Sequence, residues 1–403
     1  MRSLHSGRFS PTALASLLLA VCPAQARAEW DCATATASAE GLTTGTPLSL
    51  EARTWIVDGR TYVARWGSLH SHTSLSDGSG TPAQAFARAR GIAQMDFWGV
   101  SDHVAGPPGT PQSLTEEGWE QLKSEADAAN SPGQFVTFYG YEWSPFGEHM
   151  VLWNEPDLLV TRDILRFLAQ CGERGRLVNL SHLWNGQVPF WWAEAHPVYR
   201  PDWDQVFGLA DVWAGGPYRP VYDELISQGY RVGAFAGQDN HGPDWGLIGE
   251  ANGWGVAWSE ELTRESIDRA FRACRTYATR DRDLVITYSL RGLPDRNGER
   301  VYPMGSTVLV PITFPLVASV EVRQAAGGEP IDAVEVLRNG VQIDVVFTDA
   351  GAFALDIPMG TADLGRHAYY LRLWRLGDDR PLAVTSPIWV GGWSQNSFGY
   401  LGT

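Results

Sequence analysis

Positive charge is scarce in this sequence, and lysine is almost absent from it. The 403 residues include 31 lysines and arginines against 46 aspartates and glutamates, which gives a net charge of −15, and Lys123 is the single lysine. An acidic chain is poorly suited to bind a phosphate backbone, so we expect no nucleic-acid polymer among its partners. After residue 28 the sequence also lacks an apolar run long enough to cross a bilayer, which predicts no transmembrane segment.

The first 28 residues have the pattern of an export signal. Arg2 and Arg8 give a basic start, residues 13–21 form a short apolar run, and residues 26–28 supply small side chains for cleavage. We therefore expect an exported protein, either periplasmic or secreted. A lipid anchor on Cys22 is the alternative, although Val21 occupies a position where such a signal favours a small residue.

Cysteine is the next rarity, with four residues in the chain. Cleavage after residue 28 would leave Cys32, Cys171 and Cys274, an odd number without the spacing of a zinc site. Cys171 and Cys274 each fall on the apolar face of an expected helix, so buried thiols and a disulfide bridge both stay open. The cysteines therefore point to no particular function.

The region 67–280 alternates helical and strand-like segments, after an N-terminal extension at 29–66. Thr81, Thr161 and Thr263 each precede an amphipathic run, and Thr81 is followed by Pro82 and by Gln84 in the spacing of a capping box. Short apolar runs lie between the helical segments, at 96–100, 135–141, 176–180, 210–214 and 231–237. Runs of this length between helices favour buried parallel strands. The pattern predicts an α/β fold, either a β/α barrel or a related layered sheet.

The region 281–403 consists of strand-like segments without helices between them. The segment "VEVLRNGVQIDVV" predicts a hairpin, because Asn339-Gly340 suits a type I′ turn between two alternating runs. We expect a separate all-β, sandwich-like domain here. The sequence shows no internal repeat and no low-complexity tract.

Candidate metal ligands follow the expected strands of the first domain. His70 and His72 come after one strand, Asp102 and His103 after the next, and Glu142 after a third, with His149 seven residues later. His182 and the segment Asp239–His241 follow two further strands. In parallel β/α folds the carboxyl ends of the strands converge, so distant residues can share one site. Imidazole and carboxylate ligands together favour zinc, manganese or iron.

Several of these motifs form an ordered set. The segments "LHSHTSLSDG", "GVSDH", "GYEW…EH", "LSH" and "GQDNH" resemble, in order, the motifs of the PHP (polymerase and histidinol phosphatase) superfamily. The resemblance covers residues 67–280, and the following "CRTYATRDRDLVITYSLRG" resembles the join to a β domain in an exported PHP-like branch. Two positions depart from the usual pattern, namely Ser68, where Asp or Asn is common, and "LSHLWN", which replaces Ser-His-Pro. Neither departure removes a ligand.

The resemblance implies a distorted (β/α)7 barrel with two or three divalent metal ions. By motif, His70, His72, Glu142 and Asp239 would hold one ion, and Glu142 would bridge to a second with help from His103 or His149. The residues that would complete the remaining ligand shells are Asp77, His103, His182 and His241.

The resemblance also implies hydrolysis of a small-molecule phosphomonoester or phosphodiester. In this hypothesis Glu142 would bridge two ions, a metal-bridging hydroxide would attack phosphorus, and Asp102, Asp239 or a metal-bound water would protonate the leaving group. Weak candidates for contact with the phosphate are Arg200, Arg219, Arg280 and Arg282.

Other functions stay open at this point. The same metal chemistry would serve amide or lactone hydrolysis, and a non-catalytic protein that binds metal or glycan is a further alternative. Several tryptophans lie near the strand ends. We expect them to pack in the core, and an aromatic wall that binds a sugar or a nucleobase is the alternative. These tryptophans are Trp143, Trp184, Trp191, Trp192, Trp213, Trp245 and Trp254.

Overall fold

The computed structural model describes residues 48–104, 113–145, 149–181, 199–212, 221–247, 253–295, 298–325 and 328–394. The export signal, Cys22, Cys32 and His182 lie outside these ranges, so the predictions made for them are not addressed by the structure. Among the helices of the described ranges, none combines the length and the apolar character that a membrane span requires.

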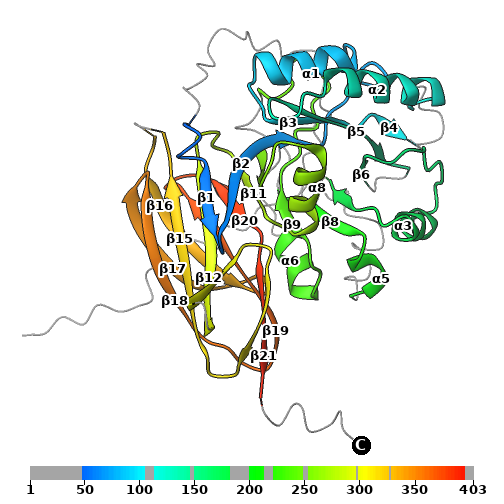
Figure 1. Ribbon diagram of the computed structural model, residues 1–403. Coiled ribbons are helices and arrows are strands. Elements are labelled where there is room, and N and C mark those ends of the chain that lie inside the picture. Colours follow the sequence, from blue (N-terminus) through cyan, green and yellow to red (C-terminus); the bar gives the residue numbers. More distant parts are fainter. Residues whose placement is uncertain are drawn as a thin grey trace, which may run out of the picture. The chain divides into compact units, whose positions relative to one another are not determined.

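Two stretches of parallel strands form the α/β part of the molecule (Figure 1). The first stretch contains β2 (Arg60–Ser68), β3 (Phe97–Val100) and β5 (Val136–Trp143), with the two-residue β4 (His103–Val104) beside β5. The second contains β7 (Val178–Leu180), β8 (Phe207–Asp211) and β9 (Gly233–Phe235). A strand overlaps each predicted apolar run, although β8 ends at Asp211, inside the run predicted at 210–214. β3, β7, β8 and β9 are buried along their whole length, as parallel strands covered on both faces must be.

A short reversed strand joins the two stretches, which the sequence prediction missed. β6 (Met150–Trp153) pairs antiparallel with β5 on one side and with β7 on the other. Only six residues separate the end of β5 from the start of β6, too few for the crossover that a parallel neighbour needs. The sheet is therefore mixed, and the closed (β/α)7 barrel stays a prediction.

Six helices occur in the described ranges. They are α1 (Pro82–Gly91), α2 (Glu116–Ala129), α3 (Ile164–Glu173), α5 (Pro201–Asp204), α6 (Val221–Gln228) and α8 (Arg264–Arg272). The predicted caps at Thr81 and Thr263 are confirmed, and Thr81 and Gln84 form both hydrogen bonds of the capping box. The predicted start at Thr161 is wrong by two residues. The carboxylate of Asp163 accepts from the backbone N–H groups of the first turn of α3 and is the actual N-cap.

Antiparallel strands on the β2 side of the α/β part extend the sheet. β1 (Thr54–Val57) pairs with β2, so residues within the predicted 29–66 extension belong to the sheet. β10 (Trp254–Ser259) pairs with β2 and with β11 (Thr276–Thr279). β11 in turn pairs with β20 (Ala383–Thr385), which links the α/β part to the β-rich part.

The C-terminal strands form a β-rich part, drawn from yellow to red in Figure 1. One four-stranded antiparallel sheet contains β12 (Val285–Asp295), β13 (Gly298–Pro303), β15 (Pro315–Arg323) and β18 (Phe353–Thr361). The other strands are β14 (Thr307–Pro311), β16 (Ile331–Arg338), β17 (Val341–Ala350), β19 (Gly365–Trp374), β20 and β21 (Ile388–Trp393). The predicted hairpin is confirmed, because Asn339 and Gly340 both have positive φ between β16 and β17.

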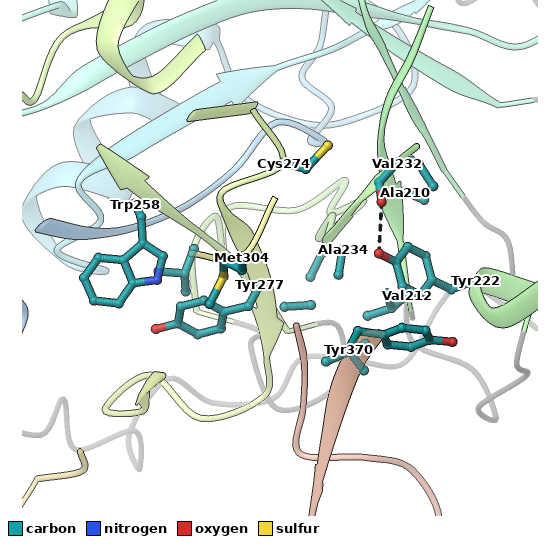
Figure 2. Packing of buried hydrophobic residues seen from close by; sticks show 14 of the residues in the cluster. Ala210, Val212, Tyr222, Val232, Ala234, Trp258, Cys274, Tyr277, Met304 and Tyr370 are labelled. Carbon is teal, nitrogen blue, oxygen red and sulfur yellow. Dashed lines mark hydrogen bonds between the residues drawn. The ribbon is translucent and has the colours of Figure 1, made fainter. Parts of the chain in front are cut away.

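Buried residues from both parts meet in one apolar core. Figure 2 shows Tyr222 of α6 and Tyr370 of β19 side by side, and their rings make an edge contact with centroids 5.7 Å apart. The Tyr222 hydroxyl donates to the carbonyl of Val232 at 3.0 Å, which ties α6 to the segment that enters β9. Cys274 lies in the same core (Figure 2). Cys171 and Cys274 are both free and buried, so neither forms a disulfide in the described ranges.

Candidate metal centre

The loop after β2 carries the first predicted ligands and is held in place by buried hydroxyl groups. The backbone N–H groups of His70 and Gln238 both donate to Ser68 Oγ, at 3.1 and 3.2 Å. Ser68 therefore ties the end of β2 to the segment after β9. A parallel bridge between Ser71 and Asn240 continues the same contact. His70 and His72 on this loop are fully buried.

Asp102 holds the far side of the same loop. Its Oδ1 accepts from the Thr73 N–H at 2.8 Å and from Ser76 Oγ at 2.6 Å, and its Oδ2 accepts from Thr73 Oγ1 at 2.7 Å. The side chain is fully buried. These three bonds fix the turn that leads to Asp77, so the observed contacts of Asp102 are those of a residue that positions the loop.

Eight of the nine predicted ligands gather into three groups of nitrogen and carboxylate oxygen atoms. Within each group the atoms lie within 4.8 Å of one another. The Asp239 group contains His70, His72, Glu142 and Asp239; the His149 group contains His103, Glu142 and His149; and the Asp77 group contains His72, Asp77, His103 and His241. The ninth, His182, lies outside the described residues.

The Asp239 group is built from the ends of three strands. Nε2 of His70 lies 3.0 Å from Glu142 Oε1, and the Nε2 atoms of His70 and His72 lie 3.2 and 3.0 Å from Asp239 Oδ1. The two imidazole Nε2 atoms are themselves 3.3 Å apart. The backbone of Asp239 has a positive φ of 49°, and its side chain lies against the two histidines. Aspartate adopts positive φ more readily than most residue types.

The His149 group depends on the reversed strand β6. His149 Nδ1 lies 2.8 Å from Glu142 Oε1, and His103 Nδ1 lies 3.0 Å from Glu142 Oε2. His149 precedes β6 rather than following a strand, contrary to the sequence interpretation. Because β6 runs antiparallel to β5, its first residues lie beside the last residues of β5, where Glu142 is. The reversal of one strand thus brings His149 to the site.

The Asp77 group lies around a half-exposed carboxylate. Asp77 Oδ1 is 3.2 Å from His241 Nε2, and Asp77 Oδ2 is 3.5 Å from His103 Nε2. The rings of His72 and His241 are stacked with centroids 4.2 Å apart. Trp245 donates from Nε1 to the carbonyl of His72 at 3.1 Å and so fixes the backbone behind this stack.

The electrostatics of the three groups favour a bound cation. Burial opposes ionisation of Glu142, but His70 and His149 beside it hold the pKa of this carboxyl well below its usual range. Burial also disfavours a charged His103, yet Asp77 and Glu142 raise the pKa of its imidazole to about 10. Burial lowers the pKa of His72, so this imidazole is disposed to stay neutral and keep a lone pair for a ligand bond. The carboxylates thus attract positive charge into a buried site.

The donor set fits divalent metal ions. The Nε2 atoms of His70 and His72 face each other and share one carboxylate oxygen of Asp239. A proton can bridge one such nitrogen to one oxygen, whereas a metal ion can accept lone pairs from both nitrogens and both carboxylates together. Three or four mixed nitrogen and oxygen ligands, as each group offers, are also typical of zinc, manganese or iron sites.

The structure gives other partners to several residues that the sequence suggested for substrate contact. Arg280 bonds to Asp378, Arg282 donates to the carbonyl of Gln94, and Arg200 pairs with Asp202, whereas Arg219 lies outside the described residues. Of the seven tryptophans singled out in the sequence, three lie inside the described ranges, namely Trp143, Trp245 and Trp254. All three are buried, and each donates from Nε1 to a backbone carbonyl. Their contacts are those of core packing.

One buried carboxylate next to the site was missed in the sequence. Asp211 is the last residue of β8, is fully buried, and has its Oδ2 3.8 Å from His70 Nδ1. In the sequence it stands inside the apolar run "ADVWA" and has no histidine beside it. Its position at a strand end could have marked it as a candidate site residue only if the end of β8 had been known.

Known proteins resemble the chain only in part. A family model described as Protein of unknown function (DUF3604) matches residues 56–153, which is less than a third of the chain. No curated protein matches this chain. The chain is similar to the crystal structure of a two-domain protein from Bacteroides vulgatus that contains a predicted PHP-like metal-dependent phosphoesterase. The TM-score is 0.47 and the identity 12%, over 85% of this chain and 97% of that chain. The function is therefore inferred from the site itself.

Proposed function

We propose that this chain is an exported, metal-dependent hydrolase of the PHP type that acts on a phosphomonoester or phosphodiester. The observation that carries the proposal is the interlocking of the three groups: Glu142, His103 and His72 each belong to two of them. Divalent ions held there would acidify water and neutralise the charge of a phosphate ester. The folded chain would then adopt the PHP-like barrel that the motifs predict.

The residues of the three groups divide the work in this proposal. Glu142 is completely buried and faces His70, His103 and His149, so it would hold two ions at a fixed separation. The side chain of Asp239 is 25% exposed and lies against the His70 and His72 pair, so it is placed both to bind an ion and to meet substrate. Asp239 is therefore the residue we assign to proton transfer to the leaving group.

Asp102 enters the proposal as a positioning residue. Its carboxylate already accepts three hydrogen bonds from Thr73 and Ser76, and it is fully buried. A proton donor must reach the leaving group directly or through one water, which this packing does not favour. Asp102 would instead keep Asp77 at the mouth of the site.

The test compares metal content with hydrolysis in the same preparations. Metal in purified protein is measured by mass spectrometry, and turnover is measured on phosphomonoesters, phosphodiesters, amides and lactones. The wild type should hold two or three ions per chain and cleave a phosphoester, while Glu142→Ala should lose both metal and turnover. The proposal fails if metal-loaded wild type releases no product from any phosphoester, or if Glu142→Ala keeps the full metal content.

Glu155→Gln is a matched control for the loss of a buried carboxylate. Glu155 is 1% exposed, but it pairs with Arg174 and Arg176 rather than with a histidine of the three groups. The control should keep the metal content and the turnover of the wild type. If the protein cleaved amides or lactones and no phosphoester, the proposed metal centre would stand and the proposed substrate class would be wrong.

A further inference from the structure

The carboxylate of Asp211 stands directly behind His70, outside the three groups. Its Oδ2 lies 3.8 Å from Nδ1 of His70, while Nε2 of the same ring faces Glu142 and Asp239 at 3.0 and 3.2 Å. Both side chains are completely buried. His70 therefore has Nε2 directed into the Asp239 group and Nδ1 directed toward a third carboxylate, that of Asp211.

A neutral imidazole carries its single proton on one of its two nitrogens. If Nε2 of His70 supplies a lone pair to an ion, the proton must be on Nδ1. A buried N–H group needs an acceptor, because leaving it without a hydrogen bond is unfavourable. Asp211 Oδ2 is an oxygen that can serve, because within the described ranges it makes no hydrogen bond and lies 3.8 Å from Nδ1, so a shift of less than about 1 Å would bring the two atoms to hydrogen-bond distance.

Two neighbours hold the Asp211 carboxylate in this direction. Asn179 of β7 donates from Nδ2 to Asp211 Oδ1 at 3.1 Å, which occupies one oxygen and leaves Oδ2 for His70. Gly237 leaves the space in which the two side chains meet. A Cβ at this position would lie 2.4 Å from Asp211 Oδ2 and 2.9 Å from His70 Cβ, closer than real Cβ atoms come.

We propose that Asp211 is a positioning residue that accepts the Nδ1 proton of His70 and thereby presents Nε2 to the metal ion. The inference rests on the proposed function, since it assumes that the Asp239 group holds an ion. A carboxylate behind a ligand histidine fixes the tautomer and the ring orientation, and loss of such a partner weakens metal affinity by about 10–100-fold.

The test uses Asp211→Asn in the full chain. The amide has the shape of the carboxylate, but it can turn an N–H toward Nδ1 and force the proton onto Nε2, the nitrogen required for the ion. Affinity for Zn²⁺ is measured by competition with a chromophoric chelator, and ligand geometry by the visible spectrum of the Co²⁺ form. We expect affinity to fall by about 10–100-fold, the Co²⁺ bands to shift, and the folded secondary structure of the metal-free protein to be kept.

Two further variants separate positioning from folding. Gly237→Ala keeps every ligand and Asp211 itself, but its Cβ would crowd the carboxylate of Asp211 and, less closely, Cβ of His70, so it should also weaken Zn²⁺ binding. Asn179→Ala leaves the carboxylate and removes its anchor, so its loss of affinity should be smaller than that of Asp211→Asn. Glu155→Gln, which removes a buried charge elsewhere, should keep the wild-type affinity and Co²⁺ spectrum.

The outcomes distinguish this inference from the proposed function. Wild type that binds neither Zn²⁺ nor Co²⁺ would overturn the proposed metal centre and this inference with it. Wild type that binds both ions while Asp211→Asn binds them equally well, with the same Co²⁺ spectrum, would overturn the role of Asp211 alone. If Asp211→Asn does not fold, equal Zn²⁺ affinity in wild type, Gly237→Ala and Asn179→Ala would overturn it.

Discussion

Arg372 of β19 is the cation of a buried network between the α/β part and the β-rich part, and its removal gives a sharp prediction. Its Nη1 lies 2.8 Å from Asp223 Oδ2 in α6, and its Nε lies 2.8 Å from Glu335 Oε2 in β16. The Tyr370 hydroxyl donates to the other oxygen of Asp223. The side chains of Arg372, Asp223 and Glu335 are 11%, 8% and 17% exposed.

Arg372→Met would fill much of the same space and leave two buried carboxylates without their cation. Removing one partner of a buried ion pair typically costs about 3–5 kcal/mol. A folded unit the size of residues 44–403 has an unfolding entropy of about 0.7 kcal/mol/K near its midpoint. We therefore expect the melting temperature to fall by about 4–7 °C.

The pH dependence of the loss follows from Asp223. Burial raises the pKa of this carboxyl above its ordinary value, although Arg372 and Tyr370 lower it in part. A carboxyl with a raised folded pKa favours the folded state when it is protonated, and this stabilisation is lost as the pH rises through that pKa. Without Arg372 the pKa of Asp223 would rise further. The deficit of Arg372→Met should therefore shrink as the pH is lowered from neutrality toward about 4, the usual pKa of aspartate.

Thermal unfolding followed by circular dichroism measures the effect for wild type, Arg372→Met, Asp223→Asn and the double variant. Asp223→Asn on the Arg372→Met background removes one buried charge that has lost its partner. It should recover about 0.5–3 kcal/mol of the free energy of unfolding. The reasoning is refuted if Arg372→Met melts within about 1 °C of wild type, or if its deficit is the same at acid and neutral pH.

Two further predictions concern the thiols and a helix cap. Burial raises the pKa of the Cys171 thiol to about 12 and that of Cys274 to about 11, so neither peptide should be alkylated by iodoacetamide in native protein at pH 8. Mass spectrometry should find both labelled after unfolding, and equal labelling of native protein would contradict their burial. Thr81→Ala removes the N-cap of α1 and should lower the free energy of unfolding by about 1 kcal/mol, measured as a lower urea midpoint. An unchanged midpoint would show that the capping box adds nothing to stability.

The site was more predictable from sequence than the sheet that carries it. His70, His103, Glu142 and Asp239 could be grouped in advance because strand ends converge, whatever the exact order of the strands. The orientation of β6 could not be predicted, because a run of four apolar residues has no periodicity that distinguishes a parallel from an antiparallel strand. His149 was therefore grouped with Glu142, beside which it lies, for a reason that does not hold.

Other limits of the sequence prediction have a similar physical origin. Asp211 was overlooked because a carboxylate at the end of a buried run is indistinguishable in sequence from one in the following loop. Asp163 was passed over in favour of Thr161, since both residue types cap helices and only the geometry of the first turn chooses between them. Asp102 was singled out by its place beside His103, but its hydrogen bonds to Thr73 and Ser76 depend on how the preceding loop folds.

The sharing of side chains among the three groups has a thermodynamic consequence. Because His72, His103 and Glu142 each stand in two groups, an ion that orders one of these side chains for its own group also orders it for the neighbouring group. The conformational entropy would then be lost mainly when the first ion binds, which favours binding of a second ion. The positive charge of the first ion would disfavour binding of the second. Metal binding at the three groups would therefore be linked, and by reciprocity an ion in one group would change the affinity of a neighbouring group by the same factor as an ion in that neighbour changes the affinity of the first. A metal titration of this protein would report a coupled set of occupancies, with no step belonging to a single group.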